Sequence, residues 1–230
     1  LVKEGYPIGS YYGYEVTGIF QESDDIVNSA QPNARPGEPI FLDYNEDGRI
    51  DPNDRVVLGN PFPDISYSLN NSISYKNFNL DIYFLGVQGL QTLNGNVLES
   101  MWPVSIERNV MTKHYINRWT PENTNTGYPS GINSAIYFRG GRMINSYTIQ
   151  DASYLRLKNI TLSYNFLMDN TKIFKSILLS LSADNLFTLT SFEGFDPEAN
   201  QEESGTGIFK SSFNNYPLAK TITIGANIVF

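Results

Sequence analysis

The sequence has no cysteine and a single histidine, His114, among its 230 residues. Without cysteine the chain has no disulfide, no thiolate zinc site and no cysteine nucleophile. One histidine also argues against a histidine-based metal site or a Ser–His–Asp triad. Charged residues are scarce, at 17% against a usual ~25%. The net charge of −8 argues against a nucleic-acid partner, because binding to a phosphate backbone requires a basic surface.

Long apolar runs are missing as well, so no segment of ~20 apolar residues is available to form a membrane helix. Aromatic residues are abundant instead, with 15 Tyr and 14 Phe. Apolar residues alternate with Ser, Thr, Asn and Gly along several segments, and this alternation predicts β-strands in an all-β fold. The segments are 65–75, 78–84, 160–166, 177–184 and 222–230, with a weaker sixth at 10–20.

Two architectures explain strands with one apolar and one polar face. A soluble β-sandwich would turn the apolar faces inward, whereas a transmembrane barrel would turn them toward lipid. The polar faces carry few of the Lys, Glu and Arg residues typical of a solvated exterior, which favours the barrel. The connections also alternate in length: 76–77 and 168–172 are short, whereas 21–62, 91–151 and 191–219 are long. Outer-membrane barrels show this asymmetry between periplasmic turns and extracellular loops.

The barrel hypothesis sets an orientation for the chain. If Phe230 lies at the periplasmic rim, the three long loops lie outside, and Arg156 and Lys158 fall near the outer end of their strand, where such side chains can snorkel. Helix-like composition within 97–119 predicts one surface helix, which faces either the outside or the lumen. Six strands cannot close a barrel, because their two edges would leave unpaired backbone groups in lipid. We therefore expect further strands outside this sequence.

Residues 43–54 carry the most specific local motif. Their first six positions match D-x-[DN]-x-[DN]-G, the beginning of a calcium-binding loop. The predicted oxygen ligands of a structural Ca²⁺ are the side chains of Asp43, Asn45, Asp47, Asp51 and Asp54 and the backbone carbonyl of Arg49. Ile50 is expected to anchor the loop by packing. The alternative interpretation is an acidic turn that is capped by its own Asp and Asn side chains and binds no metal.

The acidic segment 191–219 raises a different possibility, a secreted hydrolase that uses Glu193, Glu198 or Glu202. A solvated acidic loop is the favoured interpretation, and we expect no enzymatic activity. A soluble calcium-dependent carbohydrate-binding β-sandwich is the other alternative to the barrel.

Several strings in the chain resemble, in order, the SusC/RagA family of TonB-dependent outer-membrane transporters. The strings are GEPI at 37–40 leading into 43–54, LGNP at 58–61, YKNF at 75–78, ASYLRLKNITLSY at 152–164, DNLFT at 184–188, GFDPE at 194–198, YPLAKT at 216–221 and the terminal Phe230. Each string is modest alone, but together they extend over nearly the whole chain.

The resemblance implies that residues 1–230 form the C-terminal part of a barrel of about 22 strands. It further implies a plug and a TonB box outside this chain, energy coupling through TonB, and a location in the outer membrane of Bacteroidetes-type bacteria. The expected partners are the rest of the barrel, the lipid bilayer, a SusD-type surface lipoprotein acting as a lid, and an oligosaccharide or oligopeptide substrate. The family pattern also matches the metal loop, with Glu46 replacing a usual Gly outside the ligand set.

Overall fold

The computed structural model of the chain describes residues 2–100, 109–131, 143–168, 175–198, 201–202 and 210–230. The chain divides into two compact units, and each is treated by itself. The sheet unit comprises 62–90, 151–199 and 216–230, and the loop unit comprises 1–61, 91–150 and 200–215. No helix among the described residues is long and apolar enough to cross a membrane.

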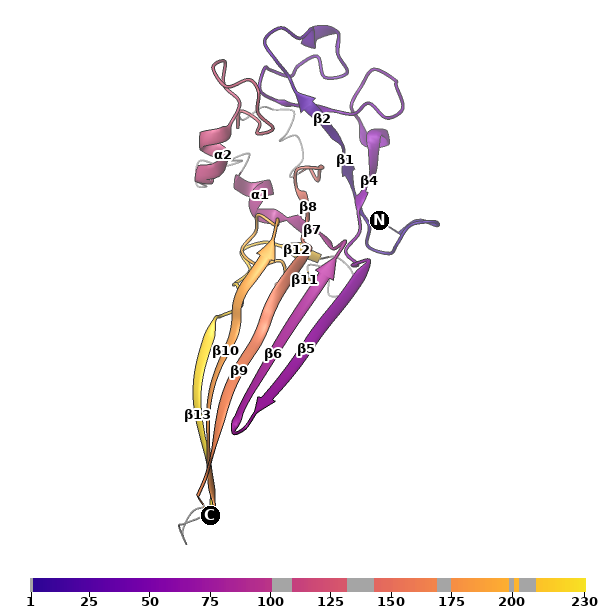
Figure 1. The fold of residues 1–230 in the computed structure, drawn as a ribbon. Helices are drawn as coiled ribbons and strands as arrows, with labels where there is room; N and C mark the ends of the chain where they lie inside the picture. Colours follow the sequence, from indigo (N-terminus) through magenta and orange to yellow (C-terminus); the bar gives the residue numbers. More distant parts are fainter. Residues whose placement is uncertain (1, 101–108, 132–142, 169–174, 199–200, 203–209) are drawn as a thin grey trace. The chain divides into compact units, whose positions relative to one another are not determined.

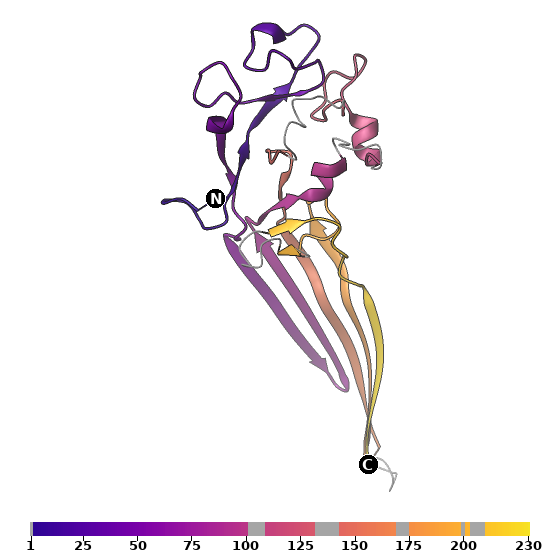
Figure 2. The same ribbon diagram turned by 180° about the vertical axis from the view of Figure 1, so that it is seen from behind.

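The sheet unit is built on one five-stranded antiparallel sheet with the order β13-β10-β9-β6-β5. Its strands are β5 (Ile65–Tyr75), β6 (Phe78–Gln88), β9 (Tyr154–Leu167), β10 (Ser176–Thr190) and β13 (Thr221–Val229). Figures 1 and 2 show these long strands as a single layer, with β5 and β13 at the two edges. The five strong segments of the sequence and the all-β prediction are thus confirmed, although β6, β9 and β10 extend further than the alternation indicated.

The apolar side chains of this sheet are exposed. On β5 the apolar row of Ile65, Tyr67, Leu69, Ile73 and Tyr75 is interrupted only by Asn71, and all of these residues are exposed. Leu69 keeps 58% of its surface and Ile224 on β13 keeps 83%. The opposite row is polar and partly hydrogen-bonded to itself, as between Ser72 and Asp81 or Asn159 and Asp184. Within the described sheet unit, no second layer covers the apolar face.

A tight turn at Lys76 and Asn77 joins β5 to β6, because Tyr75 pairs directly with Phe78. Lys76 has a φ of +52°, in the left-handed region that hairpin turns of two residues require. This short connection is the one predicted at 76–77. The second predicted turn, 168–172, lies outside the described residues apart from Met168.

A β-bulge changes the face of β9 at Lys158. On β6, Tyr83 pairs with Asn159 while the next residue, Phe84, pairs with Leu157, so Lys158 is the additional residue. A bulge of this kind reverses which positions of a strand point to a given side. After Lys158 the odd-numbered residues, such as Asn159 and Thr161, point to the polar face. Before Lys158 the even-numbered residues, such as Arg156, point to that face.

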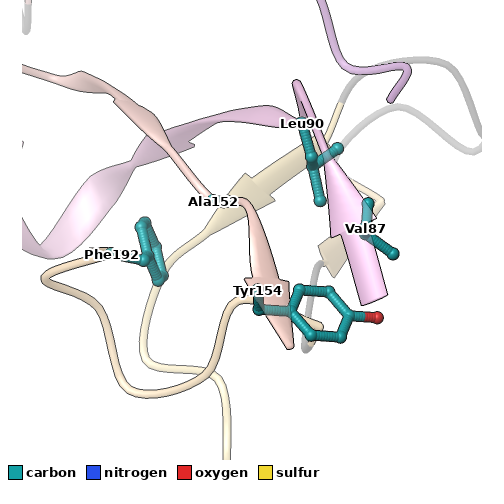
Figure 3. Close-up of a cluster of buried hydrophobic side chains, with 5 residues drawn as sticks. All are labelled: Val87, Leu90, Ala152, Tyr154 and Phe192. Atoms are coloured by element: carbon teal, nitrogen blue, oxygen red, sulfur yellow. The ribbon is translucent and has the colours of Figure 1, made fainter. Parts of the chain in front are cut away.

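A small core closes the end of the sheet from which the long loops leave. Val87, Leu90, Ala152, Tyr154 and Phe192 are all buried and pack together, with Leu85 against them. Figure 3 shows Val87 on β6 and Leu90 just after it, Tyr154 on β9 and Ala152 just before it, and Phe192 in the segment after β10. The Ala152 N–H donates to the Leu90 carbonyl at 2.8 Å, which holds the two loop entrances side by side.

The loop unit contains short strands and turns rather than long ones. β1 (Tyr11–Tyr14) pairs with β4 (Arg55–Gly59), and β2 (Val16–Ile19) pairs with β3 (Pro39–Phe41). Two short 3-10 helices, Ile26–Asn28 and Pro52–Asp54, lie between them.

The prediction of a sixth long strand at 10–20 was therefore wrong. Tyr11 packs on Leu93 and Ile149, whereas Tyr14 packs on Phe41, so these aromatic residues serve two separate small cores. Of the alternating residues, Tyr14 and Val16 belong to one of these cores whereas Tyr12 is exposed. The segment joins two small sheets instead of the five-stranded one.

The remainder of the loop unit is a four-stranded sheet and two short helices. The sheet has the order β11-β12-β7-β8, formed by Gln201–Glu202, Lys210–Ser212, Gln91–Asn94 and Ile149–Asp151. The single helix predicted at 97–119 is not formed by the described residues, which contain α1 (Gly95–Ser100) and α2 (Thr112–Asn117); residues 101–108 lie outside the description. Trp119, just after α2, is buried, and its Nε1 donates a hydrogen bond to Gln21 Oε1 at 2.9 Å.

Candidate functional site

The first half of the predicted metal loop folds around Gly48. Asp43 accepts hydrogen bonds from the backbone N–H of Asp47 at 3.2 Å and of Gly48 at 2.8 Å. Asn45 Oδ1 also accepts from Asp47 N, and Asn45 Nδ2 donates to Asp47 Oδ2 at 2.9 Å. Gly48 has a φ of +80°, which explains the glycine at the sixth position. Three of the predicted ligands are thus brought to one turn.

The second half of the loop forms a capping box. Asp51 Oδ1 accepts from Asn53 N, and Asp54 Oδ2 accepts from Asp51 N, both at 2.7 Å. Asp54 is completely buried, and its Oδ1 accepts from Tyr44 N at 2.9 Å. That last bond joins the twelfth position of the loop to the second, which brings the two ends of the loop together.

The arrangement of the 43–54 side chains therefore fits a bound cation in its first half but not in its second. Asp43, Asn45 and Asp47 lie together, but both carboxylate oxygens of Asp54 already accept backbone N–H groups. Within the described part of the chain, no group of three or more His, Asp or Glu side chains is arranged to hold a metal. The hydrogen bonds also match the alternative interpretation of a self-capped acidic turn. Arg49 donates its N–H to Asp47, and Ile50 packs against the Tyr14–Phe41 core as expected.

A buried ion-pair network in the sheet unit was not predicted. Arg156 Nη2 donates to Asp196 Oδ1 at 2.6 Å, and Arg156 Nη1 lies 2.9 Å from Glu198 Oε2. Lys158 Nζ lies 2.7 Å from Glu198 Oε1. The Arg156 and Asp196 side chains keep only 2% and 5% of their surface, whereas Lys158 and Glu198 keep 22% and 28%. Arg156 Nε also donates to Thr188 on the neighbouring strand β10.

Asp196 is the junction of this network. Besides Arg156, it accepts from the backbone N–H of Glu198 at 2.9 Å and of Leu218 at 3.0 Å. Burial alone would raise the pKa of Asp196, but hydrogen bonds from Arg156 and the two backbone groups lower the pKa below its ordinary value. The carboxylate is therefore ionised and joins strand β9, the segment after β10 and the segment before β13. A pocket of about 280 Å³ lies beside it, lined in part by Asn185, Phe195 and Lys220.

Two expectations about these residues need correction. Arg156 does not snorkel toward an interface, because the bulge at Lys158 turns it to the polar face, where it is buried. The acidic segment is also not simply solvated, since Asp196 and Glu198 are neutralised by Arg156 and Lys158. The side chain of Glu202 lies outside the description, and Glu193 is half-buried.

The apolar positions of β9 change from odd at Leu155 and Leu157 to even at Ile160 and Leu162, and this change of phase is the signal in the sequence that indicates the bulge. The contact of Arg156 with the distant Asp196 has no such local signal.

The known proteins with similar sequences are TonB-dependent receptors. No family model matches the chain. TonB-dependent receptor P3 of Formosa agariphila is 34% identical over the whole chain. TonB-dependent receptor SusC of Bacteroides thetaiotaomicron is 28% identical over 99% of the chain. The chain spans 23% of the length of the first and 20% of the second.

Solved structures show the same fold. The RagAB peptide importer in the open-open state matches 98% of this chain with a TM-score of 0.70 at 21% identity, and the chain covers 23% of it. The RagAB peptide transporter matches 95% with a TM-score of 0.71. The sheet and these relatives define the chain as a segment of a TonB-dependent receptor. It belongs to the SusC/RagA family of these receptors, whose members named here are receptors and importers rather than enzymes.

Proposed function

We propose that the chain forms part of the barrel wall of an outer-membrane nutrient importer. The observation that carries this proposal is the exposed apolar face of the five-stranded sheet, opposite a face of Ser, Thr and Asn residues. Such a sheet suits a position between hydrocarbon and an aqueous lumen. The expected location is therefore the bacterial outer membrane, with the rest of the barrel and a plug supplied by sequence beyond this segment.

Aromatic residues mark both borders of the apolar face. At the end with the short turn, Phe78 contacts Tyr164 with ring centroids 4.5 Å apart, and Tyr164 contacts Phe166 at 4.4 Å. At the other end, Phe84 and Phe187 lie 6.4 Å apart. On β5, Tyr67 and Tyr75 are separated by about 26 Å along the strand, which a ~40° tilt shortens to about 20 Å of height. Two aromatic girdles at this spacing support a bilayer as the surrounding medium.

The soluble carbohydrate-binding sandwich is not favoured. A sandwich buries its apolar faces between two packed sheets, whereas Leu69, Leu181 and Ile224 of the sheet unit are exposed.

We further propose that the receptor imports oligosaccharides or oligopeptides together with a SusD-type surface lipoprotein and draws energy through TonB. Similarity to SusC, and to a solved importer described as transporting peptides, supports this assignment. Polar hydrogen-bonding side chains along the inward face, such as Ser180, Ser182 and Thr223, suit a hydrated cargo.

The test is uptake by cells that lack the full-length receptor. Such cells are expected to lose import of one class of labelled oligosaccharide or oligopeptide and to regain it with the intact gene. Fractionation of the same cells should place the receptor in the outer membrane, in a complex with a lipoprotein. Recovery of the full-length protein in the soluble fraction without detergent would contradict the proposal.

We also propose that residues 43–54 bind a structural Ca²⁺. The convergence of Asp43, Asn45 and Asp47 at the Gly48 turn supports it. With Asp43→Ala and Asp47→Ala combined, protease cleavage within 21–62 of the full-length receptor is expected to rise several-fold. A chelator should have the same effect on the unaltered protein, and added Ca²⁺ should reverse it, because the ion would tie together a loop with little core.

The matched control changes two acidic side chains of the same stretch outside the motif, Glu22→Ala and Asp25→Ala, and should leave cleavage sensitive to the chelator as before. If the Asp43 and Asp47 substitutions increase cleavage while chelation has no effect on the unaltered receptor, the loop is a self-capped turn and the metal assignment fails.

A further inference from the structure

The pairing of β10 with β13 is not specified by the alternation of side chains alone. In the structure Ser182 pairs with Thr223 and Asp184 pairs with Thr221. The sequence of β13 repeats Thr and Ile at 221–224. A slip of one residue would exchange the two faces, but a slip of two residues would keep apolar opposite apolar and polar opposite polar. Something other than alternation must therefore select the observed register.

A tight turn does not select it either. β5 and β6 are joined by two residues, and such a turn fixes the register of a hairpin. β10 and β13 lie side by side in both views, yet the chain runs through residues 191–220 between them. A connection of that length allows a displacement of two residues without strain in the turn.

Side-chain contacts hold the beginning of β13 instead. Asp196 Oδ2 accepts from Leu218 N at 3.0 Å, and Asn185 Nδ2 donates to the Ala219 carbonyl at 3.1 Å. Leu218 and Ala219 lie three and two residues before Thr221, where the strand starts. Asn185 immediately follows Asp184, the last residue of β10 that pairs with β13. Both contacts therefore act at the boundary where pairing starts.

Each of the two side chains is itself fixed. Asn185 has a φ of +53° in the irregularity between Asp184 and Phe187, and Asn tolerates this left-handed conformation better than most residues. Asp196 is held by the buried Arg156 at 2.6 Å. A slip of β13 by two residues would move Leu218 and Ala219 about 7 Å along the strand direction, and both hydrogen bonds would be lost.

We propose that Asp196 and Asn185 are positioning residues that set the register of β13 against β10, with Arg156 holding Asp196 in place. If the segment is part of a closed barrel, as the proposed function holds, this register also contributes to the stagger between strands that determines the barrel's dimensions. The register assignment itself does not depend on import activity.

The experiment is disulfide mapping in the full-length receptor, with any cysteines elsewhere replaced. Ser182→Cys is combined in turn with Thr223→Cys, the native partner, and with Thr221→Cys or Gly225→Cys, the partners after a slip of two residues. Directly opposed residues lie within disulfide reach, whereas diagonal ones, ~7–8 Å apart, lie beyond its usual range. The unaltered network should give mainly the 182–223 product.

In the background of Asp196→Ala with Asn185→Ala, the ratio of displaced to native product is expected to rise about tenfold or more, as loss of one charge-assisted hydrogen bond implies. Glu198→Gln is the matched control, since the Glu198 side chain forms ion pairs with Arg156 and Lys158 but no hydrogen bond or ion pair with residues 216–220, all of which the structure describes. It should leave the 182–223 product dominant. An unchanged pattern in the double variant would overturn the proposal. Equal loss of all three products would do so too, because it would show an effect on stability without any effect on register.

Discussion

Arg156→Ala is expected to destabilise the full-length receptor by about 3–5 kcal/mol, the usual consequence of removing one partner from a buried ion pair. The substitution leaves Asp196 buried at 5% exposure without its cation. Thermal unfolding of the receptor in detergent or lipid measures the change. At pH 7 the whole loss of unfolding free energy is expected, because the pKa of Asp196 is lowered in the folded protein and the carboxylate is ionised there. It should shrink as the pH falls through that lowered pKa, where the carboxylate becomes protonated in both the folded and unfolded states.

Lys158→Ala provides the control for this prediction. Lys158 belongs to the same network, but it and its partner Glu198 keep 22% and 28% of their surface. A solvated pair of this kind contributes roughly 0–1 kcal/mol. Equal effects of the two substitutions would show that burial of Arg156 does not control the strength of the network.

The second prediction concerns the apolar face. Ile160→Arg is expected to lower the free energy of unfolding of the receptor by about 2–4 kcal/mol, the range for an arginine on the lipid face near the bilayer midplane. Ile160 pairs with Ile82 and Ala183 in a row that lies between the two aromatic girdles, so its side chain would meet hydrocarbon. The fraction of receptor recovered as a folded, heat-modifiable band from outer membranes should fall accordingly.

Thr161→Arg tests the other side of the same strand. Thr161 pairs with Asp81 on the polar face, where a guanidinium has water and a carboxylate nearby. Folding of this variant should be close to that of the unaltered receptor. If Thr161→Arg were as damaging as Ile160→Arg, the assignment of the faces to lipid and lumen would be wrong.

The sequence predicts the long strands well because each has one apolar and one polar face, which leaves a period of two. Residues 65–75 were predicted with the bounds that β5 has in the structure, since a tight turn follows at Lys76. The same rule failed at residues 10–20. There, Tyr14 belongs to one small core and Tyr11 on the same strand to another, while Tyr12 is exposed, so the alternating residues do not form one face of a long strand.

In the candidate sites, contacts between residues close in the sequence were predictable, whereas contacts between distant segments were not. The spacing of Asp43, Asn45 and Asp47 predicts a turn around Gly48, and the structure forms that turn because these contacts are local. Contacts between distant segments have no such pattern. Arg156 and Asp196 meet only because β9 pairs with β10 and the chain then returns over the end of the sheet.

The bulge at Lys158 makes β9 two alternating stretches that are out of phase with each other. Deletion of Lys158 would remove the bulge, and Leu157 and Asn159 would then follow one another in ordinary alternation, so both stretches would keep their faces. Deletion of a residue within one stretch, such as Thr161, would instead exchange the lipid and lumen faces of the residues on one side of the deletion. A change of one residue in length is therefore tolerated far better at the bulge than elsewhere in the strand.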